Sequence, residues 1–256
     1  MSSNAWLALL LDGPMQSWGH ASRFERRTTA LHPTRSGVLG LIAAALGIDK
    51  HAPDEAEQLA RFAPLRVTTV KFDKRDWRGR ELPIQRLEDY HTVAFTREAG
   101  ANTARVAKLL ARARGPISAE DRGSEIKQTT RHFLLDARFG VLLEGPSALL
   151  EEIAAALRNP KWGVWLGRKC CLPASPLHVA PPGNHAFAWA ALLRRAGCSG
   201  TETEEQFDRV IEASATDSGA DMIEDHPVGF GNPIGERHAP RWIRRVPKSS
   251  IVNPKS

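Results

Sequence analysis

The N-terminal segment reads Ala5-Trp6-Leu7-Ala8-Leu9-Leu10-Leu11, an apolar run that ends at Asp12-Gly13-Pro14. A short apolar run bounded by turn residues is typical of a β-strand buried on both faces. The run is too short to cross a bilayer. A signal peptide would require basic residues before the apolar run, and no basic residue precedes Arg23. We therefore expect a buried first strand in a cytoplasmic protein that does not associate with a membrane.

The segments that follow the first strand predict a helix and a second strand. The helix is expected over Val38–Leu46, because Thr34 or Ser36 can cap its start and Gly47 is a natural C-terminal stop. Leu65–Phe72 alternates loosely and is rich in β-branched residues, which indicates a strand.

The rest of the chain repeats this order after an insertion. A strand is expected within His132–Leu143, a helix over Ala148–Leu157 and a short strand at Gly163–Leu166. The pattern β-α-β, insertion, β-α-β is typical of an α+β ferredoxin-like or RRM-like domain, with an antiparallel sheet and helices on one face. This domain would span residues 1–180, with the insertion at about 73–131, including a basic helix at Thr103–Arg114. Residues 181–256 would form a small C-terminal extension packing on it.

Composition is that of a globular protein, but the charge is uneven. The chain has 256 residues, 42% of them hydrophobic and 25% charged, which excludes a wholly disordered or fibrous protein. Its net charge is +6 and its pI about 9.5. Residues 61–138 carry 17 basic and 10 acidic side chains, whereas residues 201–225 carry one basic and nine acidic. The basic regions are those expected of a polyanion binder, and a merely solvated charged surface is an equal alternative on composition alone. The acidic stretch predicts an exposed helix or loop.

Three short motifs carry groups that suit RNA. The loop from Gln16 to Arg27 combines an amide, a hydroxyl, an indole and guanidinium groups, which can read base edges, stack on bases and hold phosphates. Alternatively, Trp18 fills the core and only the arginines are solvated. Arg35 at a helix start and Arg168 in Gly167-Arg168-Lys169 are placed to bind phosphate, although a simple cap and a solvated turn are the plainer alternatives.

A fourth motif, Asp89-Tyr90-His91-Thr92, contains the only tyrosine, and Arg131 precedes a second histidine. Tyrosine and histidine near cations can cleave RNA without metal, with histidine as general acid or base. The alternative is that Tyr90 stacks or packs while His91 bonds to backbone. No metal-ligand cluster, nucleophile elbow or P-loop motif occurs in the sequence, and the three cysteines fit no disulfide or zinc spacing. We therefore expect no cofactor, no metal and no dedicated hydrolase or NTPase.

Two stretches together resemble one protein family closely. They are Gly13-Pro14-Met15-Gln16-Ser17-Trp18-Gly19 and Pro33-Thr34-Arg35-Ser36-Gly37-Val38-Leu39-Gly40-Leu41. Asp89-Tyr90-His91-Thr92-Val93 and Leu166-Gly167-Arg168-Lys169-Cys170-Cys171 follow in the expected order. The chain thus resembles the CasD family, the fifth numbered Cas family, in its type I-E form from the CRISPR Cascade complex. The similarity spans residues 5 to about 178.

The resemblance implies a RAMP-type, RRM-like domain with an inserted thumb, acting as a non-catalytic RNA-binding subunit in antiviral defence. Such a subunit would cap the 5′ end of the CRISPR RNA (crRNA) and hold its repeat-derived handle. The implied partners are the Cascade backbone subunit through the thumb, the Cascade large subunit, and target DNA indirectly through the guide. A related branch of the family cleaves the precursor RNA, so a metal-independent endoribonuclease is the alternative.

Together, the motifs and the resemblance predict one set of RNA-binding residues and no catalytic residue. The set is Gln16, Ser17, Trp18, Gly19, Arg23, Arg26, Arg27, Thr34, Arg35, Ser36, Gly37, Tyr90, His91, Arg131, Gly167, Arg168 and Lys169.

Overall fold

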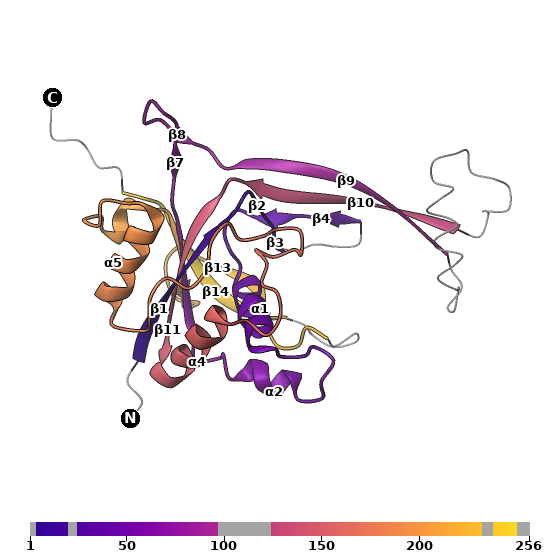
Figure 1. The fold of residues 1–256 in the computed structure, drawn as a ribbon, viewed down its shortest axis with the longest axis horizontal. Coiled ribbons are helices and arrows are strands. Elements are labelled where there is room, and N and C mark those ends of the chain that lie inside the picture. The colour runs from indigo at the N-terminus through magenta and orange to yellow at the C-terminus, as the bar shows by residue number, and fades with distance from the viewer. Residues whose placement is uncertain (1–3, 20–24, 97–123, 232–237, 250–256) are drawn as a thin grey trace.

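The computed structural model describes residues 4–19, 25–96, 124–231 and 238–249. Its main sheet has six antiparallel strands in the order β1-β11-β6-β12-β14-β13 (Figure 1). In that order the strands are β1 (Asn4–Asp12), β11 (Arg138–Pro146), β6 (Arg66–Lys71), β12 (Arg209–Ala213), β14 (His238–Val246) and β13 (Ala220–Pro227). The protein is therefore a mixed α and β fold built on antiparallel sheets, as expected.

The predicted strands at Ala5–Leu11 and Leu65–Phe72 are confirmed as β1 and β6. Gly163–Leu166 forms no strand, because the backbone turns there: the Gly167 amide donates to the Trp165 carbonyl at 2.8 Å. The free edge of β1 is instead covered by the extended segment 174–183, which forms isolated antiparallel bridges to Trp6 and Leu9. The sequence order of elements was right, but the segment that flanks β1 lies farther along the chain than expected.

The two helices of the predicted domain cover one face of the sheet, as expected, and a helix of the C-terminal extension covers the other face (Figure 1). The helices α1 (Arg35–Leu46) and α4 (Ser147–Arg158) share a core with Leu7, Leu9 and Leu11 of β1. The helix α5 (His185–Ala196) packs against Ala8 and Leu10, whose side chains point to the other face. The reason is visible in the first strand, which is apolar on both faces and so needs cover on both. A short helix, α2 (Glu55–Ala60), follows α1.

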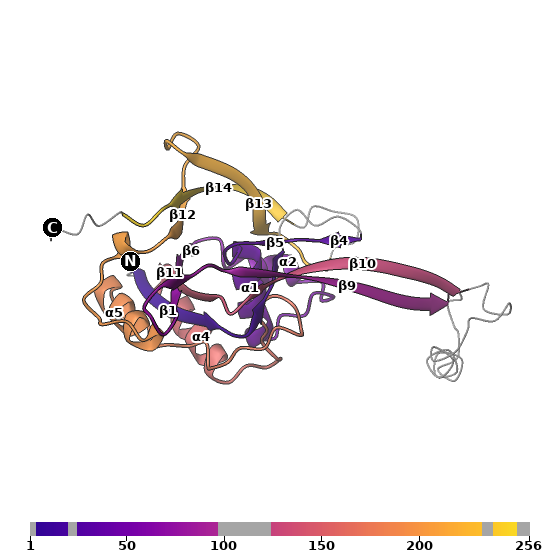
Figure 2. The same cartoon turned by 90° about the horizontal axis from the view of Figure 1, so that it is seen from above.

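The insertion contains a long antiparallel hairpin that extends away from the main sheet (Figure 2). Its strands are β9 (Gln85–Thr96) and β10 (Ser124–Leu135), and β10 also pairs with β2 (Met15–Gln16) and, in parallel, with β4 (Arg26–Arg27). The prediction of one strand within His132–Leu143 was therefore wrong. Two strands, β10 and β11, meet at Asp136, where a φ of 50° turns the chain. The predicted helix Thr103–Arg114 lies outside the described residues.

Two further small sheets complete the fold. They are β3 (Trp18–Gly19) with β5 (Thr29–Ala30), and β7 (Lys74–Arg75) with β8 (Glu81–Leu82). None of the described helices is long and apolar enough to span a membrane.

The acidic stretch 201–225 is not the exposed helix or loop that its charge predicted. It contains the 3₁₀ helix η2 (Glu204–Gln206), strand β12 and most of strand β13. Ile223 is buried, and Asp225 is among the buried acidic side chains. The prediction from charge composition failed because Glu212 and Asp225 of this stretch contact the buried Arg35.

Candidate nucleic-acid interface

The predicted RNA-binding residues divide into a buried group and a surface group. Gln16 is fully buried, and its Nε2 donates to the carbonyls of Leu11 at 3.0 Å and Ala137 at 2.7 Å. Its Oε1 accepts from Trp18 Nε1 at 3.0 Å. The indole is also fully buried and lies so close to Gly37 that a Cβ there would be 2.7 Å from the ring. These residues therefore join the loop to α1, which matches the alternative of Trp18 in the core.

The start of α1 is capped as predicted, and a carboxylate of the protein already lies at this helix N-terminus. Thr34 is the N-cap, and its Oγ1 accepts from the Gly37 amide at 3.2 Å, with Ser36 beside it. The amide of Arg35 donates to the carboxylate of Asp225 at 2.8 Å. A carboxylate at a helix N-terminus is stabilised by the free amides and the helix dipole. Asp225 thus occupies the place where a phosphate was expected.

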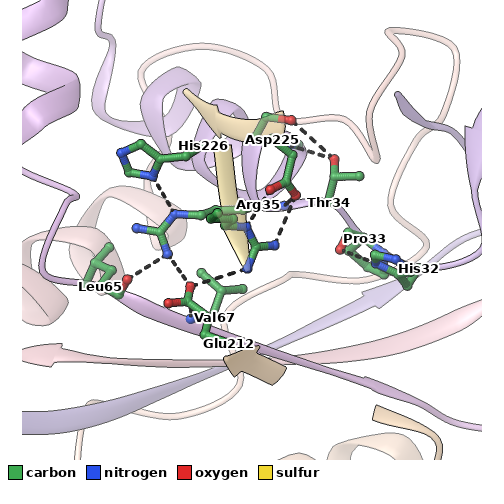
Figure 3. Close-up of polar contacts among 12 residues, drawn as sticks. His32, Pro33, Thr34, Arg35, Leu65, Val67, Glu212, Asp225 and His226 are labelled. Carbon is green, nitrogen blue, oxygen red and sulfur yellow. Dashed lines mark hydrogen bonds and ion pairs between the residues drawn. The ribbon is translucent and has the colours of Figure 1, made fainter. Parts of the chain in front are cut away.

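Arg35 is an interior residue (Figure 3). Its exposed fraction is 2%, and its guanidinium donates to Glu212 at 2.6 Å and to His226 Nδ1 at 3.0 Å. It also donates to two backbone carbonyls, those of Phe62 and Leu65. Burial lowers the pKa of Arg35, while the charge of Glu212 raises it. This corrects the prediction of a phosphate contact, because the guanidinium is enclosed and its N–H groups have protein acceptors.

The surface group has its centre where β4, β10 and the turn at 167–169 meet. Arg27 is paired with Arg131 in the β4–β10 register, so both side chains lie on the same face of this sheet. Arg168 reaches that face from the turn: its guanidinium carbon lies 4.9 Å from the centroid of the Phe133 ring, and its Nη2 donates to the Arg27 carbonyl at 3.0 Å. We call Arg27, Arg131 and Arg168 the arginine cluster.

Among the residues that the structure describes, the three arginines of the cluster form no ion pair with a carboxylate. Burial, and then the charges of Arg131 and Arg27, lower the pKa of Arg168. Within the described part of the chain, Arg131 Nε and Arg168 Nη1 are buried without a hydrogen-bond partner, as are Thr129 Oγ1 and His132 Nε2. Leaving buried N–H groups unpaired costs free energy, and an anionic acceptor would remove both that cost and the repulsion.

Gly167 allows the turn at 167–169 to pack closely against Ser17, in the loop that begins at Gln16. Its φ is +96°, and a Cβ would lie 1.8 Å from the carbonyl oxygen of Ser17. The Ser17 amide in turn donates to Leu166 at 3.0 Å, and the Ser17 hydroxyl donates to the His132 carbonyl at 3.1 Å. Lys169 is exposed, with its Nζ 5.8 Å from the Trp165 ring centroid. Only a residue without a side chain fits this approach, so Gly167 positions Arg168 and Lys169.

Tyr90 and His91 lie on β9 beside the cluster, on opposite faces of the hairpin. Tyr90 is 62% exposed and pairs with Thr130, whereas His91 pairs with Thr129 and lies 3.5 Å from Asp89. Adjacent residues of a strand point to opposite faces, so the two side chains do not converge on one substrate atom. His91 shares the face of Arg131.

The remaining predicted residues are also exposed or undescribed. Gly19 and Arg26 are exposed, and Arg26 pairs with Thr130, which places it on the face of Tyr90. Arg23 lies outside the described residues. The structure therefore places Arg27, His91 and Arg131 on one face, with Arg168 of the turn at 167–169 reaching it, and Arg26 and Tyr90 on the opposite face. It places Gln16, Ser17, Trp18, Thr34 and Arg35 in the interior.

The chain matches the family model described as CRISPR-associated protein (Cas_Cas5) over residues 6–223. It belongs to that family. It is 32% identical over 178 residues to the CRISPR system Cascade subunit CasD of Escherichia coli (strain K12), covering 68% of this chain and 70% of that relative. The resemblance identified from the sequence is thus confirmed.

Two solved structures are similar to this Cas5 chain. A chain of a CRISPR RNA-guided surveillance complex matches with a TM-score of 0.64 and 28% identity, covering 95% of this chain and 90% of that one. The crystal structure of a Cas protein matches with a TM-score of 0.57 and 28% identity, with 95% of both chains covered.

Sequence reasoning missed Phe133, which supports the Arg168 guanidinium. It noted His132 only as a second histidine and left it and Thr129 out of the contact set, and both carry buried polar atoms without a partner in the described structure. Residues 129, 131 and 133 alternate along β10, so they lie on one face. The signal was present in the sequence, but it depends on recognising that the strand begins at Ser124 and not at His132.

Proposed function

We propose that this chain is a non-catalytic RNA-binding subunit of a type I-E Cascade surveillance complex. In this role it caps the 5′ end of the crRNA and anchors the repeat-derived handle for antiviral defence. Membership of the Cas5 family and the similarity to a Cascade subunit and to a chain of a surveillance complex support this proposal.

The arginine cluster is the observation that carries the proposal. Three guanidinium groups lie together, and two of them have buried N–H groups without an acceptor among the described residues. A phosphate provides several acceptor oxygens and negative charge, which is what this arrangement lacks. Tyr90 is 62% exposed on the opposite face of the same hairpin, and an aromatic side chain there can stack on an unpaired base. Phosphate contacts and stacking are the means by which proteins bind single-stranded RNA.

The exposure of the predicted residues supports a smaller contact set. We propose that Gly19, Arg26, Arg27, Tyr90, His91, Arg131, Arg168 and Lys169 contact the handle. Arg23, which lies outside the described residues, stays a proposed contact. Gln16, Ser17, Trp18, Thr34 and Arg35 would support this surface from within, together with Ser36 and Gly37 at the start of α1, while Gly167 positions the turn.

The fold is compatible with the ferredoxin-like RAMP domain inferred from the resemblance. The order β1-β11-β6, with segment 174–183 on the outer edge of β1, supports this part of the proposal. In this proposal the β9–β10 hairpin is the thumb that contacts the backbone subunit, the large subunit binds on another side, and target DNA is reached through the guide. The C-terminal region 181–256 packs on this domain.

The test is binding of the full chain to a labelled CRISPR repeat RNA in EDTA, with a scrambled RNA as control. The wild type should bind the repeat selectively and leave it intact. Arg27→Ala/Arg168→Ala should reduce affinity at least tenfold and flatten the dependence on salt by about 1.5 units of slope, since each lost phosphate contact contributes about 0.7 on a single strand. Lys50→Ala, an exposed cation elsewhere, is the matched control. Unchanged affinity and slope in the double variant would remove the cluster from the site.

A metal-independent endoribonuclease that processes the precursor is the second candidate. The observation in its favour is that His91 lies on the face of Arg131 in the β9–β10 hairpin. In the same assay, discrete cleavage in EDTA that disappears in His91→Ala would establish the nuclease and overturn the non-catalytic proposal. Intact RNA with both proteins would reject this candidate.

A further inference from the structure

A second basic and aromatic surface lies on the small β7–β8 hairpin. Its turn, Arg75-Asp76-Trp77-Arg78-Gly79-Arg80, contains three arginines and one acidic residue. Trp77 is 85% exposed, the highest value among the exposed large hydrophobic side chains of the described residues. The guanidinium carbon of Arg78 lies 4.4 Å from the centroid of the Trp77 ring. This surface adjoins the start of β9, and in Figure 1 it projects from the body of the molecule away from β4.

The turn holds this tryptophan in place without burying it. Asp76 Oδ1 accepts from the amides of Arg78 and Arg80, each at 2.9 Å, and Asp76 Oδ2 accepts from Arg80 Nε at 2.8 Å. Gly79 has a φ of +76°, which closes the turn. The backbone hydrogen bond from Arg80 holds the pKa of Asp76 below its usual value. The only carboxylate of the turn therefore serves its geometry, and the indole is presented on an ordered loop.

The charges of the turn are available to a ligand. Arg75 is paired with Glu81 at 3.5 Å, and Arg80 with Asp76, but the arginine side chains remain 63% and 70% exposed. Exposed ion pairs of this kind contribute little free energy, so a phosphate can compete for these arginines. No carboxylate partner of Arg78 is found in the described structure.

The charges of the neighbouring groove are less available to a ligand than those of the turn. A cavity of about 1280 Å³ lies between the hairpin and the end of α5. Of its cations, Lys74 and Arg138 face Asp12, and Lys248 faces Asp73 and Glu81. Arg75 of the turn also lines the cavity and is paired with Glu81. Its positive charge is matched by the protein itself, so the exposed turn, and not the groove, suits a polyanion.

We propose that the tip of the β7–β8 hairpin binds a single-stranded nucleic acid, with Trp77 stacked on one unpaired base and Arg75, Arg78 and Arg80 contacting the adjacent phosphates. Aromatic side chains accept any base by stacking, and arginines beside them hold the backbone. A rigid, exposed indole among cations suits this ligand better than an apolar protein surface, which would have to desolvate three guanidinium groups. The site is separate from the arginine cluster and does not depend on the cluster binding the handle.

The test isolates the tip by using the full chain with Arg27→Ala/Arg168→Ala as background. Labelled single-stranded oligouridylate and oligothymidylate are titrated by fluorescence anisotropy, which distinguishes an RNA from a DNA ligand. Adding Trp77→Ala should weaken binding about tenfold for the ligand that the tip prefers, whereas Trp77→Phe should retain most of the affinity. Arg78→Ala should reduce the slope of affinity against salt by about 0.7.

Controls separate binding from folding and from general hydrophobic contact. Trp77 is so exposed that its replacement should leave the thermal midpoint unchanged. Met222→Ala removes another exposed apolar side chain, from β13, and should leave both affinities unchanged. Quenching of tryptophan fluorescence by the oligonucleotide should be smaller in Trp77→Phe than in the background protein. If Trp77→Ala and Trp77→Phe bind both oligonucleotides as tightly as the background, the proposal is wrong, and a protein partner becomes the explanation for the exposed indole.

Discussion

Arg35 and Arg168 look alike in the sequence and differ completely in the structure. Each lies within two residues of a glycine, next to a strand or helix end, and each predicts a phosphate contact. Arg35 is enclosed, and its guanidinium donates to one carboxylate, one imidazole and two carbonyls. Arg168 rests on Phe133 beside two other arginines, and its Nη1 has no partner among the residues described. Arg35 is neutralised by the protein, whereas no ion pair neutralises Arg168 in the described part of the chain.

The difference is produced by residues far away in the chain. Glu212 lies 177 positions from Arg35, and Asp225 lies 190 positions from it. Both come from the acidic stretch, on strands that extend the main sheet beyond β6. The turn at 167–169 receives no carboxylate of this kind in the described structure. The absence of a nearby carboxylate in the described structure is therefore the reason to propose Arg168, and not Arg35, as a contact for an anionic ligand.

The largest expected effect is the loss of stability when Arg35 is removed. Arg35→Met should lower the free energy of unfolding by about 3–5 kcal/mol, because the buried carbonyls of Phe62 and Leu65 lose their donor and Glu212 loses its nearest cation. Glu212 then keeps the Val67 amide at 3.1 Å and Arg241 at 3.6 Å. Arg168→Met, at the other arginine, should change it by less than about 1 kcal/mol. Urea unfolding of both variants measures the contrast. Equal effects of the two substitutions would mean that the two arginines do not differ as the structure indicates.

Gln16 offers a second way to sharpen the comparison, with a smaller effect. Gln16→Leu fits the site in size but leaves the carbonyls of Leu11 and Ala137 and the Trp18 N–H without their partners. We expect a loss of about 2–4 kcal/mol in unfolding free energy, since each unpaired buried group costs about 1–3 kcal/mol. Repeat-RNA affinity of the folded variant should stay within about twofold of the wild type. A large loss of affinity with unchanged stability would instead place Gln16 in contact with RNA.

Features that depend on neighbouring residues in the chain were predicted from the sequence, and features that depend on distant residues were not. The first strand, α1 with its cap at Thr34, β6 and α4 depend on local periodicity and capping, and these predictions were confirmed. The break between β10 and β11 at Asp136 rests on one residue with positive φ, which periodicity cannot reveal. Gln16 and Arg35 are buried by partners more than a hundred residues away, and Trp18 is buried by packing against α1. The sequence does not show these partners, so it could not distinguish these buried residues from residues of an interface.

The smallest expected effect is a pH dependence that arises from the enclosed arginine. Burial, and then the charge of Arg35, lower the pKa of His226, whose Nδ1 accepts from Arg35 Nε. An unfolded histidine takes up a proton near pH 6.5, whereas the folded His226 stays neutral to lower pH. The unfolded state therefore binds more protons in this range, and the stability falls as pH drops from about 6.5 toward the lowered pKa.

Above pH 6.5 this contribution of His226 is fully present, so unfolding free energies measured between pH 8 and pH 5 should decline only in the lower half of the range. His226→Asn can still accept from Arg35 but cannot take up a proton, and its decline should be shallower than that of the wild type. Arg168→Met should leave the slope as it is, because that arginine has no histidine acceptor in the described structure. Identical slopes in wild type and His226→Asn would show that Arg35 does not depend on a neutral imidazole, and the enclosed network would then rest on Glu212 and the two carbonyls alone.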